Sequence, residues 1–134
     1  MSSYSSFKKI ENEIYLNKIE PVGATVEHFE QYLDEALIFL NSIESKSILI
    51  VDLTTAKMLT ANLKSKLGYF YRDHRDMIKE KVLGAVYIAP SPVIQITLKN
   101  AFFIGSPPME YKIVSNMELA MIWAKRKLIL EKTS

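Results

Sequence analysis

Segments with the apolar pattern of a strand alternate along the chain with segments that have the apolar spacing of a helix. Short β-like runs at 7–10 and 14–19 flank Glu11-Asn12-Glu13, which predicts a hairpin with a three-residue loop. Apolar residues then recur every three or four positions across 26–44, and Thr25 stands where an N-cap is favoured. The first third of the chain is therefore predicted to form a hairpin followed by a helix.

The middle of the chain continues with strand, helix and strand. The continuous apolar run Ile48-Leu49-Ile50-Val51 ends at Asp52, which is typical of a central strand buried on both faces. We expect a single second helix, capped by Thr60 and ending near Lys81. The apolar run at 82–88 follows as another buried strand.

The last third of the chain predicts a helix, a short strand and a final helix. Ser91-Pro92 suits the start of the third helix, and Gly105 suits its end. A strand at 111–114 precedes a helix at 115–130, where Ser115 and Glu118 form a predicted capping box. The order is β-β-α-β-α-β-α-β-α, which predicts an α/β fold with about four helices. Its sheet should be mixed and mostly parallel, with the N-terminal hairpin at one edge.

Composition narrows the class of protein. A length of 134 residues predicts one domain, spanning 1–134. The chain has no cysteine, which excludes disulfides and thiolate metal sites. A net charge of +2, without a basic stripe, argues against a nucleic-acid partner. Because the N-terminus is polar and no apolar run is long enough to span a membrane, we expect a cytoplasmic protein.

Several short motifs resemble those of a known family. They are Val51-Asp52-Leu53-Thr54, Ala89-Pro90-Ser91-Pro92, Ser106-Pro107-Pro108, and the stretch from Glu118 to Trp123-Ala124. With the order of elements, they resemble the STAS domain, and more closely a bacterial group of uncharacterised STAS-like, anti-sigma-factor-antagonist-like proteins. The resemblance covers nearly the whole chain and implies a STAS-like fold acting in bacterial regulation.

The chain departs from that family at its phosphorylation motif. Antagonists of the sporulation type carry Asp-Ser-Ser-Gly at the start of the helix after the central strand, and a kinase phosphorylates a serine there. The matching stretch here is Thr60-Ala61-Asn62-Leu63, so Ala61, which has no hydroxyl, occupies the acceptor position. The resemblance therefore does not imply a phosphoserine switch.

Hydroxyl and carboxylate side chains are predicted to gather at the carboxyl ends of the parallel strands. In open α/β sheets ligands tend to bind at this end, and helix N-termini there favour small anions. The alternative is that these side chains only cap helices and close turns, which such residues strongly prefer. The residues in question are Asp52, Thr54, Thr55, Thr60 and Ser91.

His74 is the only obvious candidate for acid–base chemistry. A general base needs a nucleophile or an orienting carboxylate that converges on it. The helical neighbours of His74 toward the core are apolar, which favours a structural histidine. With His28 it shows no matched ligand spacing, and the glycines are scattered, so we predict no enzyme, metal site or cofactor.

The third helix has more apolar residues than one buried stripe accommodates. Val93, Ile96 and Phe103, beside Pro107 and Pro108, are predicted to form an interface. We therefore expect a non-catalytic binding module that takes a protein partner or self-associates. The alternative is a carrier of a small apolar or lipid-like ligand, which needs a cavity of several hundred Å³.

Overall fold

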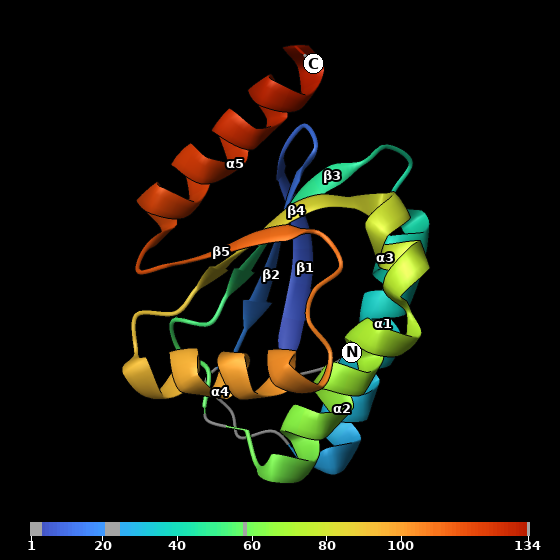
Figure 1. Cartoon of the computed structure of the whole chain (residues 1–134), viewed down its shortest axis with the longest axis vertical. Helices are drawn as coiled ribbons and strands as arrows, with labels where there is room; N and C mark the ends of the chain where they lie inside the picture. The colour runs from blue at the N-terminus through green and yellow to red at the C-terminus, as the bar shows by residue number, and fades with distance from the viewer. Residues whose placement is uncertain (1–3, 21–24, 58, 134) are drawn as a thin grey trace.

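The structure, a computed structural model, describes residues 4–20, 25–57 and 59–133. Five strands form one sheet in the order β1-β2-β3-β4-β5 (Figure 1). The first pair is antiparallel and the other three pairs are parallel, so the predicted mixed, mostly parallel sheet is confirmed. The strands are β1 (Ser5–Glu11), β2 (Ile14–Ile19), β3 (Ser47–Asp52), β4 (Val82–Ile88) and β5 (Glu110–Val114).

The described part of the chain contains five helices, one more than predicted. They are α1 (Val26–Ser42), α2 (Ala61–Asp73), α3 (Arg75–Lys81), α4 (Pro92–Ile104) and α5 (Met117–Thr133). The helix predicted from Thr60 to Lys81 is divided at His74, whose φ of −112° and ψ of 24° leave the helical region. No proline or glycine marks this junction, so the sequence contains no local signal for it.

The hairpin loop is shorter than predicted. Strand β1 continues through Glu11, and only Asn12 and Glu13 connect it to β2. Glu13 has a φ of 65°, a left-handed conformation that is common in tight hairpin turns. A register shift between Lys9 and Glu11 accommodates the longer strand.

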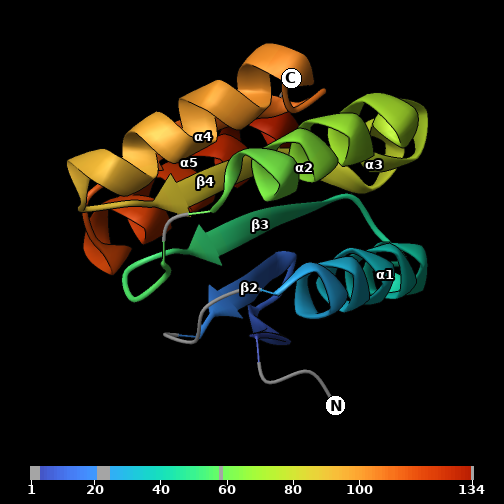
Figure 2. The same cartoon turned by 90° about the horizontal axis from the view of Figure 1, so that it is seen from below.

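The two faces of the sheet are covered unequally, as Figure 2 shows from below. Along β3, Leu49 and Val51 pack in the core beneath α1 to α4, while Ile48 and Ile50 face the core beneath α5. This alternation follows from the twofold period of a strand. Three crossover connections therefore lie on one face, and α5 alone covers the other.

Capping residues determine where most of the helices begin. Thr25 and Thr60 accept hydrogen bonds from the first turns of α1 and α2, as predicted. Ser91 is the N-cap residue of α4, but its side chain makes no capping bond. The capping box predicted at Ser115 is wrong, because Asn116 accepts the hydrogen bond from Leu119 N and α5 begins after it.

Candidate functional site

The polar residues predicted at the carboxyl ends of the strands are engaged in turns and caps. The carboxylate of Asp52 accepts hydrogen bonds from the backbone N–H and the hydroxyl of Thr54. The hydroxyl of Thr55 donates to the carbonyl oxygen of Ile19 at 3.1 Å, and that of Thr60 caps α2. These bonds fit the alternative that the polar side chains only cap helices and close turns. An anion site at this end of the sheet stays a prediction.

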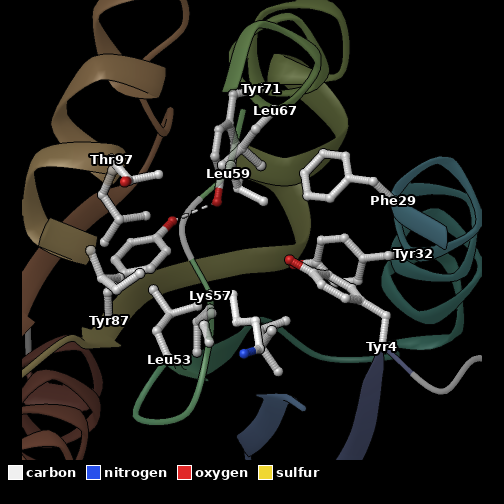
Figure 3. Close-up of a pocket in the computed structure, with 15 residues that line it drawn as sticks. Tyr4, Phe29, Tyr32, Leu53, Lys57, Leu59, Leu67, Tyr71, Tyr87 and Thr97 are labelled. Atoms are coloured by element: carbon white, nitrogen blue, oxygen red, sulfur yellow. Dashed lines mark hydrogen bonds between the residues drawn. The ribbon is translucent and has the colours of Figure 1, made fainter. Parts of the chain in front are cut away.

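A small cavity lies between the sheet and the helices that cover it (Figure 3). Its volume is about 50 Å³, and most of its lining is apolar. A second cavity of about 40 Å³ shares Tyr32, Val51, Leu67 and Tyr71 with the first. Residues of β3, β4, α1, α2 and α4 form much of the lining of the first cavity, namely Val51, Tyr87, Phe29, Tyr32, Leu67, Tyr71, Ile94, Thr97 and Leu98. The other lining residues are Tyr4, Ile19, Leu53, Ala56, Lys57 and Leu59.

Four tyrosines contribute hydroxyl groups to this largely apolar cavity, which Lys57 and Thr97 also line. The hydroxyls of Tyr71 and Tyr87 are 2.6 Å apart, and the hydroxyl of Tyr32 donates to Asn17 Oδ1 at 2.9 Å. Burial raises the pKa of Tyr4 and of Tyr71 to about 12, and raises the pKa of Tyr32 and of Tyr87 well above the usual 10.0. All four side chains are therefore neutral phenols at physiological pH.

No motif in the sequence predicts the tyrosine cluster. Tyr32 and Tyr71 stand among helical apolar positions and look like ordinary core residues. The available signal was the hydroxyl itself, because a buried tyrosine usually needs a hydrogen-bond partner. Which partner it finds depends on residues distant in the chain, such as Tyr87.

In Figure 1, β5 runs between α4 and α5. A larger, open groove along the outer side of β5 is lined by residues of all three elements. Its volume is about 460 Å³. Apolar residues of β5 and α5 form much of its lining, together with two cations, Lys112 and Arg126. The apolar residues are Ile113, Val114, Leu119, Ile122 and Trp123.

The residues predicted as an interface on the third helix are only in part exposed. Val93, Ile96 and Phe103 are 51%, 58% and 93% exposed, so the outer side of α4 is apolar. Pro107 is buried and Pro108 is half-buried, because the loop after α4 turns back into the protein. The exposed surface therefore excludes Pro107.

His74 lies at the junction of α2 and α3, with its ring 5.0 Å from that of Phe70. It lines an open groove with Glu30, Asp34 and Asp73. It makes no hydrogen bond or ion pair through its side chain with any residue that the structure describes. Over the same residues, no group of three potential ligands is arranged to hold a metal ion.

Comparisons with known proteins leave the family of the chain open. Within the described ranges, no helix is both long enough and apolar enough to cross a membrane. A scan against protein-family models finds no match, and a search of curated proteins finds no similar sequence. What these residues do is therefore argued from their geometry.

Proposed function

We propose that the chain is a non-catalytic protein-binding module with a STAS-like fold, and that it binds an extended segment of a partner along β5. The observation that carries the proposal is the groove at the outer side of this edge strand. Among the described strands, β5 pairs only with β4, so one side of its backbone is left without a strand partner. Such an edge can accept a further strand through main-chain hydrogen bonds.

Side chains around the edge favour an apolar partner segment. Ile113 and Val114 extend from β5, while Leu119, Ile122 and Trp123 lie on α5. Leu119 and Ile122 are 45% and 49% exposed, so a bound strand would remove further apolar surface from water. Removing apolar surface from water stabilises a complex by about 25 cal/mol per Å² before the costs of association.

The charges of the groove favour an acidic partner. Lys112 and Arg126 both line it, and neither forms an ion pair with a described residue. No acidic residue is among those that line the groove. A segment that alternates apolar and acidic residues would complement the groove, and its binding should weaken as salt is added.

The geometry supports a protein partner better than a lipid-like ligand. The two cavities between the sheet and its helices measure about 50 and 40 Å³, whereas a lipid-sized ligand needs several hundred. His74 has no carboxylate partner among the described residues, which gives a catalytic alternative no support. A role in bacterial regulation, without a phosphoserine switch, belongs to the same proposal.

A displayed library of short random peptides tests the proposal. We expect the selected peptides to alternate apolar and acidic residues and to shift the amide NMR signals of residues 112–114. Ile122→Asp should abolish the binding of these peptides. The matched control Ile38→Asp, at a 71% exposed position on α1, should leave it unchanged.

Selected peptides that shift signals elsewhere, or that bind Ile122→Asp as well as wild type, would contradict the proposal. Failure to enrich any sequence over the starting library would contradict it too.

A further inference from the structure

The hydroxyls of Tyr71 and Tyr87 leave one hydrogen without an acceptor. Two phenol groups have two O–H hydrogens, and the bond between them uses one, whichever hydroxyl donates. Neither hydroxyl makes another hydrogen bond to a residue that the structure describes. One donor of this tyrosine pair, Tyr71 and Tyr87, is therefore available in the protein interior.

This donor lies at the side of the cavity beneath α1, α2 and α4. Figure 3 shows the two hydroxyls meeting there, with Tyr87 coming from β4 and Tyr71 from α2. Tyr87 is only 2% exposed, so bulk water does not satisfy the pair from its side. A buried donor without a partner is costly, which favours any molecule that brings an acceptor to it.

The lining of the cavity determines which kind of molecule fits. Leu53, Ile94 and Leu98 are hydrocarbon, and the hydroxyl of Thr97 already donates to Val93 O at 2.9 Å. Of the other polar residues in the lining, Tyr32 already donates to Asn17 Oδ1 and Lys57 is exposed to solvent. A trapped water needs two to four polar partners, so water is the competitor that a ligand must displace. The volume of about 50 Å³ exceeds what one water requires but is far below that of a drug-sized pocket.

We propose that this cavity binds a small, neutral, largely apolar molecule with one hydrogen-bond acceptor, such as a ketone, aldehyde or ester. Its acceptor oxygen would receive the hydrogen of the tyrosine pair, and its hydrocarbon part would contact the leucine and isoleucine side chains. We expect a neutral molecule to bind better than a carboxylate, because the tyrosine pair offers one neutral donor and Lys57, the cation in the lining, is exposed and remains hydrated. The site is separate from the β5 groove, and the proposal does not depend on peptide binding there.

Two probes of nearly equal shape test the role of the acceptor. They are acetone and isobutene, in which a CH₂ group replaces the carbonyl oxygen, and both are small enough for this cavity. Binding is followed by methyl NMR signals of Leu53, Ile94 and Leu98. We expect both probes to shift these signals, and acetone to bind about three to ten times more tightly, the range for one net hydrogen bond.

Phenylalanine variants test the role of the tyrosine pair. Tyr71→Phe and Tyr87→Phe should each keep the preference for the ketone, because one hydroxyl with one hydrogen remains. The double variant should still bind both probes, with a ratio of affinities near one. Tyr111→Phe is the matched control, because this tyrosine is 40% exposed and its ring contacts that of Tyr87.

Equal affinity of wild type for the two probes would overturn the assignment of the acceptor. Absence of any shift in the three methyl signals would overturn the site itself. If the double variant does not fold, the ratio measured with wild type and with the single variants still decides the question.

Discussion

The contact between α2 and α4 depends on two glycines, and Gly105→Ala tests how closely these elements must approach. A methyl group at Gly105 would lie 1.9 Å from the carbonyl oxygen of Gly68, whereas ordinary contact begins at 3.4 Å. The two backbones would have to separate by about 1.5 Å, the difference between these distances. Because the methyl would meet backbone, no change of rotamer can relieve the overlap.

We expect Gly105→Ala to lower the free energy of unfolding by about 2–3 kcal/mol, the upper part of the range for overpacked cores. The backbone conformation contributes nothing to this loss, since Gly105 has a φ of −151°, which any residue adopts. Urea unfolding, followed by the fluorescence of Trp123, the single tryptophan, measures the change.

Two further variants show whether the loss comes from the backbone overlap at Gly105. A methyl at Gly68 would lie 2.6 Å from Ala101 O, but alanine gains up to about 1 kcal/mol of helix propensity over glycine, so Gly68→Ala should lose less. Asn100→Ala, at an exposed position of α4, should stay within about 0.5 kcal/mol of wild type. The reasoning would be refuted by a Gly105→Ala protein as stable as Asn100→Ala.

Other predictions concern the cap of α5, the buried tyrosines and phosphorylation. Asn116→Ala should cost about 1 kcal/mol in urea unfolding and Ser115→Ala less than about 0.5, and the reverse order would contradict the cap described above. A buried tyrosine whose pKa is raised from 10.0 to about 12 contributes a stability that is complete below pH 10 and lost as the pH rises toward 12. The urea midpoint should therefore fall between pH 10 and 12 and fall less steeply in Tyr71→Phe, whereas equal slopes would show that Tyr71 does not contribute. After incubation with bacterial lysate and ATP, mass spectrometry should find no stoichiometric phosphate on Thr55 or Thr60, and such phosphate would contradict the absence of a phosphoswitch.

The errors of the sequence analysis share a cause. The capping serine, the hairpin loop and the continuous helix through His74 were each inferred from local preference. In each case a neighbouring residue or conformation could take the same place, as Asn116 takes the N-cap position that was assigned to Ser115. Differences of less than about 1 kcal/mol between such local alternatives are decided by packing.

Features that rest on strong local signals were predicted correctly. Thr25 and Thr60 cap their helices, and α4 runs from Pro92 to Ile104 before Gly105. Gly105 ends α4 as predicted, but the structure adds a second reason for a glycine there. It does not adopt a left-handed conformation, and it is required because Gly68 lies so close.

The order of strands and helices follows from the sequence, except for the break between α2 and α3, because apolar periodicity and caps act over a few neighbouring residues. Only the tertiary structure decided what meets across these elements. The hydroxyls of Tyr71 and Tyr87 belong to residues 16 positions apart, and the β5 groove combines residues from α4 to α5. Such contacts depend on how each crossover positions its helix over the sheet. No local pattern of residues encodes how closely two such elements approach.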